Sequence, residues 1–188
     1  MSVDAPADSL LVSCEHGGND VPAAFAPLFE GHGALLASHR GWDPGTLALA
    51  RQMAGTLGAP LHTSTTTRLL VDLNRSIGHR QLFSAISAAL PRSVRDGIVA
   101  AHYRPHRDAI ERDIAACVAA GRRVVHVAVH SFVPVLGGRV RRADVACLYD
   151  PQRAGEVELA RRWLAALATR QARLALRRND PYRGNSDG

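Results

Sequence analysis

Histidine residues follow two apolar stretches of the chain, and histidine can bind a metal ion. Residues 10–12 (Leu-Leu-Val) lead into Ser13-Cys14-Glu15-His16-Gly17-Gly18-Asn19, and the β-branched run 123–129 leads into His130. We interpret both stretches as buried strands. Polar groups at the ends of buried strands form the sites of α/β proteins, so His16 and His130 are expected to meet at one edge of a sheet. A catalytic zinc ion usually has three protein ligands of the His and carboxylate types and one open position.

A carboxylate would complete this ligand set, and the candidates are Glu15, Asp43 and Asp72. Adjacent side chains of an extended strand point to opposite faces, so Glu15 can share a metal with His16 only if the chain bends. Asp72 is not excluded, because residues two apart on a strand share a face, and Asp72 can therefore face the site together with Asn74. Asp43 lies in a polar loop and can turn inward, and we favour it as the third ligand. The alternatives are that Asp43 only caps the helix that starts at Pro44 and that the histidines are structural. No HExxH or CxxC motif is present to strengthen the prediction.

Asn74 and Arg75 form a second group, directly after the mostly apolar stretch 69–73 (Leu-Leu-Val-Asp-Leu). Asn donates and accepts hydrogen bonds, and Arg binds a carboxylate with two parallel N–H groups. This pair is therefore predicted to hold the anionic end of a substrate. The alternative is a surface arginine beside an Asn turn.

Composition restricts the function classes. The chain has 188 residues, a formal net charge of +6 and a pI near 10.2, but it contains no lysine and its arginines are spread along the chain. Patterned aromatic residues for base stacking are also missing, so we predict no nucleic-acid partner. No apolar run is long enough for a membrane span, and residues 1–8 do not resemble a signal peptide. Three widely spaced cysteines fit a reduced, cytoplasmic protein.

The order of predicted elements indicates an α/β fold. Strands alternate with helices, which predicts a mixed or mostly parallel sheet with helices on both faces. Residues 66–73 are expected to form a buried strand. A long helical region is expected from Pro91 to Ala120, with a kink or break at Pro105. No linker divides the chain, so a single domain over residues 1–188 is predicted.

Seven short motifs resemble the N-formylglutamate amidohydrolase family, in family order and over nearly the whole chain. They are Ser13–Asn19, Ser38–Asp43, Thr67–Ser76, His102–His106, His130–Phe132, Leu148–Pro151 and Arg178–Tyr182. The resemblance implies a phosphorylase/hydrolase-like α/β fold, similar to that of zinc carboxypeptidases and aspartoacylases. In those relatives two histidines bind zinc and an Asp-Leu-Asn-Arg segment helps to bind a substrate carboxylate. His16, His130, Asn74 and Arg75 stand at the matching positions.

Two departures from the pattern of these relatives affect the expected site. Zinc carboxypeptidases place a Glu three residues after the first His, where this chain has Asn19. The related enzymes also use a Glu late in the chain as general base, and no counterpart is found before Gly188. We therefore expect that the chain lacks the family's C-terminal part, or uses another base, or is inactive. The catalytic residue stays unassigned, with Glu15 as the remaining candidate.

The resemblance implies zinc-dependent hydrolysis of a small anionic N-acyl amino acid. N-formylglutamate is the family substrate, an intermediate of histidine degradation, and would give formate and glutamate. His16, Asp43 and His130 would bind Zn²⁺, while Arg75, with Asn74 and Arg68, would hold the substrate carboxylate. The alternatives are another zinc deacylase or carboxypeptidase-like hydrolase and a non-catalytic binding protein of the same fold.

Overall fold

The structure is a computed structural model that describes residues 8–180, 182, 184 and 185. Contacts within the chain gather into two compact units, Met1–Phe132 and Val133–Gly188, and each unit is described by itself. The single domain expected from the sequence stays a prediction. No helix in the described ranges is both long and apolar enough to cross a membrane.

The first unit is built on a parallel sheet with the strand order β2-β1-β3. The central strand β1 (Asp8–Cys14) pairs on one side with β2 (Leu61–Thr63) and on the other with β3 (Arg123–Ala128). In the register of β1 and β3, Ser13 lies opposite Ala128. These two adjacent strands therefore end at the same edge of the sheet.

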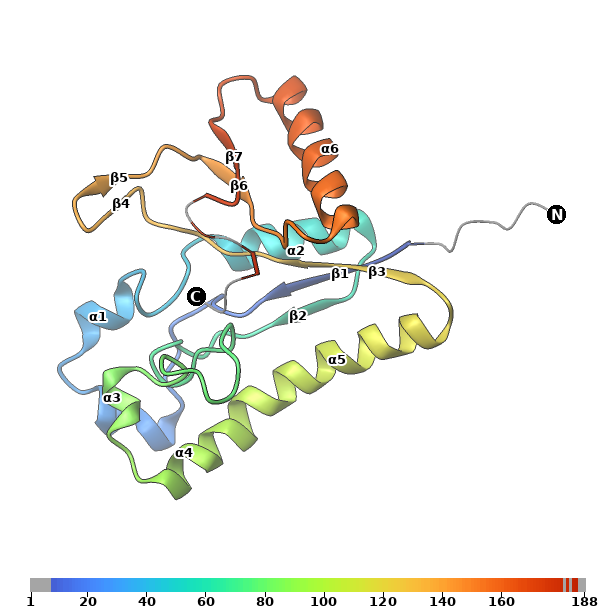
Figure 1. Cartoon of the computed structure of the whole chain (residues 1–188). Coiled ribbons are helices and arrows are strands. Elements are labelled where there is room, and N and C mark those ends of the chain that lie inside the picture. The colour runs from blue at the N-terminus through green and yellow to red at the C-terminus, as the bar shows by residue number, and fades with distance from the viewer. Residues whose placement is uncertain (1–7, 181, 183, 186–188) are drawn as a thin grey trace. The chain divides into compact units, whose positions relative to one another are not determined.

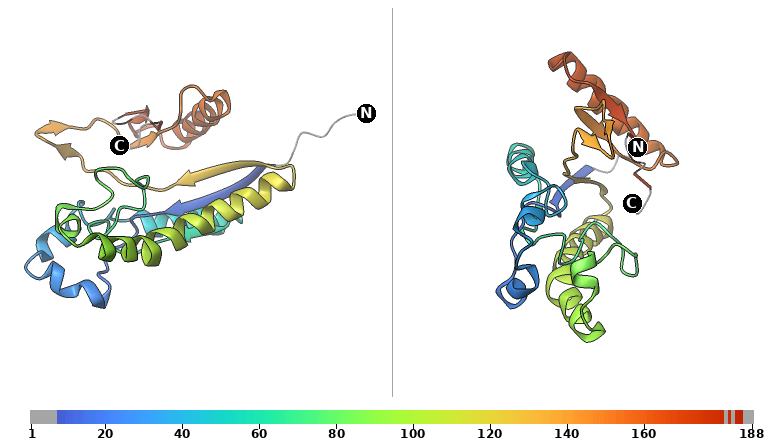
Figure 2. Two further views of the ribbon diagram at one scale, coloured as in Figure 1. Left: turned by 60° about the horizontal axis from the view of Figure 1, so that its bottom comes forward. Right: turned by 90° about the vertical axis from the view of Figure 1, so that its left-hand side faces the viewer.

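Two helices cover this sheet. Figures 1 and 2 show α2 (Thr46–Leu57) and α5 (Arg104–Ala119) on opposite sides of the strands. Val12 and Cys14 of β1 pack with Ala50 and Ala54 of α2 in one buried cluster. The predicted α/β class, with a parallel sheet and helices on both faces, is confirmed.

Short helices and loops form the rest of the unit and carry a second core. The short elements are the 3₁₀ helix η1 (Ala23–Phe29), α1 (Gly33–Ala37), α3 (Ala85–Ala88), α4 (Arg92–Ile98) and the π-helical turn η2 (Val99–Tyr103). Buried residues of these segments and of the chain after β2 pack together, namely Phe29, Leu69, Leu70, Val71, Leu73, Leu82, Ile98 and Tyr103. This second core supports the loop that carries Asp72.

The helical region from Arg92 to Ala119 changes its winding where a break was predicted. The π-helical turn η2 separates α4 from α5, and Pro105 lies in the first turn of α5. Proline has no N–H to donate, and the first turn is the place where a helix has no acceptor for that group. Pro105 therefore fits at the start of a new helix.

Residues 66–73 do not form the predicted strand. The segment is a series of turns in which Leu70 N–H donates to the carbonyl of Thr67 and Arg75 N–H donates to the carbonyl of Asp72. Thr67 Oγ1 also accepts the N–H of Leu69, a local bond that competes with strand pairing. The apolar run thus indicates that these residues are buried in the second core, and it does not indicate an extended backbone.

The second unit contains two small sheets and one long helix. β4 (Val135–Leu136) and β5 (Arg139–Val140) form a hairpin through Gly137 and Gly138, which both have positive φ. β6 (Val145–Cys147) pairs in parallel with β7 (Leu176–Arg178), and α6 (Ala154–Arg170) connects them. Two consecutive glycines favour a tight hairpin turn of this kind, because glycine adopts positive φ without a steric penalty.

Candidate metal centre

The two histidines after β1 and β3 lie side by side. The N–H of Val129 donates to the carbonyl of Ser13 over 2.9 Å, which continues the strand pairing up to His130. The ring centroids of His16 and His130 are 5.1 Å apart. His16 is only 1% exposed, whereas the backbone and ring of His130 keep contact with solvent. The parallel register therefore brings both imidazoles to one edge of the sheet, as expected.

Asp43 reaches the same edge from the loop before α2. Its N–H donates to the carbonyl of His16 over 2.9 Å, so the loop is attached directly to the end of β1. Gly41 lets this loop approach closely, because a Cβ there would lie 2.2 Å from the carbonyl oxygen of Leu36. Gly45, with φ of 82°, is the N-cap of α2. The Asp43 side chain does not cap the helix and instead turns toward the histidines.

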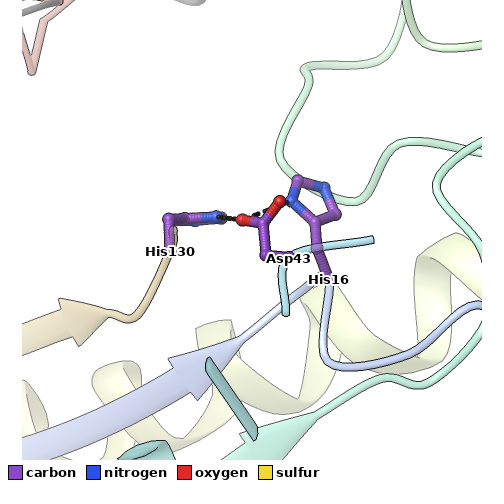
Figure 3. A group of neighbouring side chains, drawn as sticks. All are labelled: His16, Asp43 and His130. Carbon is purple, nitrogen blue, oxygen red and sulfur yellow. Dashed lines mark hydrogen bonds and ion pairs between the residues drawn. The ribbon is translucent and has the colours of Figure 1, made fainter. Parts of the chain in front are cut away.

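His16, Asp43 and His130 each offer one ligand atom, and these atoms all lie within 4.8 Å of one another. Asp43 Oδ2 is 3.0 Å from Nδ1 of His130 and 3.5 Å from Nδ1 of His16. Figure 3 shows the Asp43 carboxylate between the two rings. The same oxygen also accepts the backbone N–H of Ser131 over 3.3 Å. One carboxylate and two Nδ1 atoms thus converge on one point.

Each histidine contacts a further carboxylate through its other ring nitrogen. Nε2 of His16 lies 2.7 Å from Asp72 Oδ1, and Nε2 of His130 lies 3.2 Å from Glu15 Oε2. Carboxylates in this position orient metal-binding histidines and fix their tautomer. Both rings can therefore keep their proton on Nε2 and direct the Nδ1 lone pair toward Asp43.

Arg68 connects the acidic groups around His16. Its Nη2 lies 2.7 Å from Asp72 Oδ2, and its Nη1 lies 3.5 Å from Asp43 Oδ1. Burial raises the pKa of both carboxyl groups, but this effect is outweighed. Contacts with His130 and His16 lower the pKa of Asp43, and contacts with His16 and Arg68 lower that of Asp72. Both side chains are accordingly anionic near neutral pH.

The pKa values of Glu15 and His130 shift in opposite directions. Burial raises the pKa of Glu15, but His106, His130 and Ser13 together hold it well below its usual range. Burial lowers the pKa of His130, whereas Asp43 and Glu15 raise it to about 9. Without a metal ion, His130 is therefore a cation between two anions.

The residues fit a zinc ion. Nδ1 of His16 is buried and has no hydrogen-bond partner in the structure, although a buried polar atom normally has one. Two imidazole nitrogens and one carboxylate oxygen are ligand types that catalytic zinc accepts. A cation at the point where the three ligand atoms converge would satisfy the unpaired nitrogen and offset the charge of Asp43.

The chain also shares its sequence pattern with a known family. The sequence model of the family described as N-formylglutamate amidohydrolase matches residues 8–187. This chain belongs to the N-formylglutamate amidohydrolase family. This chain is similar to the crystal structure of gene product Atu2144 from Agrobacterium tumefaciens, with a TM-score of 0.82 and 33% sequence identity. The match covers 95% of this chain and 71% of that chain, and no curated protein matches this chain.

The three predicted substrate residues differ in how closely they contact the carboxylates of the site. Arg68 lies inside the group, between Asp43 and Asp72. Arg75 is half-buried, and its Nε is 3.9 Å from Asp72 Oδ2 and makes no hydrogen bond. Asn74 is exposed, and the contact that holds it is from its backbone N–H to Asp72 Oδ1 over 3.0 Å. The substrate roles of these three residues stay predictions.

Three polar residues near Glu15 were not assigned a role from the sequence, although Ser13 and His106 lie in two of the motifs that resemble the family. Ser13, His106 and His126 surround Glu15 or connect to it. One signal was present, because Ser13 and Glu15 are two apart at the end of an expected strand, and residues two apart on a strand share a face. The contact with His126 joins residues 113 positions apart, so it required knowledge of the pairing of β1 with β3.

Proposed function

We propose that the chain hydrolyses the amide bond of an N-acyl amino acid with a zinc ion bound by His16, Asp43 and His130. The observation that carries this proposal is the convergence of the three ligand atoms within 4.8 Å, with the Nδ1 of His16 buried and unpaired. The family supports an amidohydrolase reaction. When bound, zinc supplies Lewis acidity toward a carbonyl and lowers the pKa of water.

The protein's own residues prepare the site for this chemistry. Asp72 holds the ring of His16 through Nε2, and Arg68 holds Asp72 and Asp43 in fixed positions. Among the described residues, Arg68 is the guanidinium at hydrogen-bond distance from these carboxylates, 2.7 Å from Asp72. With His130 neutral, the three anions Glu15, Asp43 and Asp72 therefore favour a divalent cation. Ligand geometry is thereby set before a metal ion or a substrate arrives.

N-formylglutamate is the proposed substrate. Arg75 Nε lies 3.9 Å from Oδ2 of Asp72, which itself contacts His16, and a guanidinium in this position can bind a carboxylate of such a small molecule. In the overall reaction the C–N bond breaks, the hydroxyl of water joins the formyl carbon, and a proton passes to the leaving amine. The products are formate and glutamate.

One observation favours a second candidate, a binding protein without hydrolytic activity. A general base must reach the water molecule that attacks. Of the carboxylates near the centre, Asp72 is engaged by His16 and Arg68, and Glu15 by His130 and Ser13. In the described residues the general base is therefore unassigned, and a chain that binds metal and ligand without turnover would have the same geometry.

The experiment that tests the proposal measures metal content and formate release on the full chain. Protein dialysed against zinc and then against buffer should retain one zinc per chain and release formate from N-formylglutamate. His16→Ala and His130→Ala should each lose the zinc, while the exposed His32→Ala, a matched control, should keep it. Stoichiometric zinc in both site variants would show that the ligand set is wrong.

The substrate panel separates the remaining alternatives. Release of amino acids from peptides, without activity on N-formylglutamate, would support a carboxypeptidase-like hydrolase. Zinc binding together with saturable N-formylglutamate binding but no formate would support the binding protein.

A further inference from the structure

Glu15 is a buried acid next to the proposed zinc site that contributes no atom to the group of three ligands. It is 2% exposed, and it directly precedes His16 at the end of β1. A buried carboxylate is costly unless hydrogen bonds or opposite charges compensate it. Its partners therefore indicate what it does.

The two oxygens of Glu15 have different partners. Oε1 accepts the hydroxyl proton of Ser13 over 2.5 Å and lies 3.8 Å from Nε2 of His106. Oε2 is buried and makes no hydrogen bond among the described residues; Nε2 of His130, at 3.2 Å, is the group that it faces. One oxygen is thus fixed by the protein core, and the other is directed at a single ring nitrogen.

The hydrogen bonds behind Glu15 have only one consistent direction. An ionised carboxylate only accepts hydrogen bonds, so the single hydroxyl proton of Ser13 must point to Glu15. Nε2 of His126 lies 2.8 Å from Ser13 Oγ, so this nitrogen must be the donor to the hydroxyl oxygen. This series of hydrogen bonds, from His126 to Ser13 and from Ser13 to Glu15, therefore fixes the carboxylate from the side of β3.

The position of His130 creates a competition between its two tautomers. Its Nδ1 is 3.0 Å from Asp43 Oδ2. A neutral His130 with its proton on Nδ1 would donate to Asp43, and Nδ1 would then have no lone pair to offer a metal ion at this point. A proton on Nε2 leaves Nδ1 free, and Glu15 is the acceptor that stabilises this second tautomer.

We propose that Glu15 is a positioning residue that holds His130 as its Nε2–H tautomer and thereby presents Nδ1 to the metal. This inference rests on the proposed function, because it assigns a role toward the same zinc site. It gives Glu15 a task at the far side of the imidazole, not that of the general base that takes a proton from the attacking water. Ser13 and His126 serve the same task by fixing the carboxylate.

The test measures zinc affinity by competition with a chromophoric chelator in Glu15→Ala, Glu15→Gln and the matched control Glu111→Ala. Glu111 is an exposed carboxylate on α5. Glu15→Ala should lower zinc affinity about 10- to 100-fold, the range for partners of metal-binding histidines. Glu15→Gln should restore most of it, because the amide oxygen can still accept the Nε2–H. Glu111→Ala should bind zinc as the unmodified chain does.

Nitrogen-15 NMR of the imidazoles adds a readout that a merely structural role would not change. The zinc-loaded chain should show His130 with zinc on Nδ1 and a proton on Nε2. Zinc on Nε2, or full zinc affinity in Glu15→Ala, would overturn the inference and leave the proposed function intact. If the unmodified chain binds no zinc, the proposed function fails and this inference fails with it. If Glu15→Ala does not fold, the NMR spectrum of the unmodified chain and the zinc affinity of Glu15→Gln still decide whether the inference holds.

Discussion

Asp72 lies 2.7 Å from Nε2 of His16 and so determines that Nδ1 is the nitrogen of His16 that faces Asp43. Both residues are buried, Asp72 at 5% and His16 at 1% exposure. The pair links the turn-rich segment after β2 to the end of β1. The ligand geometry of His16 therefore depends on a residue that does not belong to the group of three ligands.

We expect Asp72→Ala to lower zinc affinity about 10- to 100-fold, because His16 then loses the acceptor that fixes its tautomer. Asp72→Asn should lose less, since the amide oxygen still accepts the Nε2–H. Chelator competition measures the affinity, and the exposed Asp96→Ala on α4 is the matched control. Equal affinity in Asp72→Ala and the unmodified chain would contradict the role of Asp72.

We expect Arg75→Ala to raise KM for N-formylglutamate about 10- to 100-fold with a smaller effect on kcat. The change corresponds to about 1.5–3 kcal/mol, the usual contribution of a hydrogen bond to a charged group. Steady-state formate release measures both constants, and exposed Arg92→Ala on α4 is the control. An N-formyl amino acid amide without a free carboxylate should lose much less in Arg75→Ala, and an unchanged KM for N-formylglutamate would remove Arg75 as the clamp.

The stability of the metal-free chain should fall as the pH rises from about 6.5 to about 9. The folded-state pKa of His130 is raised from 6.5 to about 9 by Asp43 and Glu15. The protonated ring therefore stabilises the fold fully below pH 6.5, and this contribution is lost as the pH passes through the folded-state value. Because His130 contacts solvent, we expect a modest effect.

Urea unfolding in the presence of a chelator, at several pH values between 6 and 9, measures this dependence. His130→Gln removes the titrating group, so its free energy of unfolding should vary less over the same range. Parallel curves for the two chains would show that the ion pairs of His130 do not contribute.

We expect Leu70→Ala to lower the free energy of unfolding by about 2–5 kcal/mol, the range for a leucine truncated in a packed core. Leu70 is fully buried and belongs to the second core with Phe29, Ile98 and Tyr103. Leu49→Ala on α2 is the control, because Leu49 is 49% exposed. Urea unfolding by circular dichroism compares them, and equal losses would mean that the second core does not stabilise the chain.

The meeting of His16 and His130 at one edge of the sheet was predictable, because it depends on residue patterns that are local in the sequence. A β-branched run that ends in His130 and an apolar run that ends before His16 indicate two buried strands, and parallel pairing then brings their ends together. The choice of Asp43 as the third candidate ligand followed from its freedom in a loop. The structure places this residue beside both histidines, and the ligand assignment itself awaits metal analysis.

The error at residues 66–73 has a physical cause. Leu69, Leu70 and Val71 are buried, and a short apolar run does not distinguish a buried strand from a buried turn. Thr67 decides the outcome through side-chain and backbone contacts with Gly41 and Leu69. The contact with Gly41, in the loop that carries Asp43, joins residues 26 positions apart in sequence, so the local pattern does not contain it.

Backbone hydrogen bonds join all the segments that carry the site: Asp43 N–H to the His16 carbonyl, Arg68 N–H to the Gly41 carbonyl, and Val129 N–H to the Ser13 carbonyl. None of these bonds uses a side chain. The side chains at positions 16, 43 and 130, which are the proposed metal ligands, could therefore be exchanged while the surrounding loops keep their places. This separation makes the centre a suitable starting point for redesign toward a different metal ion, with ligand identity as the adjustable part and the main chain as a fixed template.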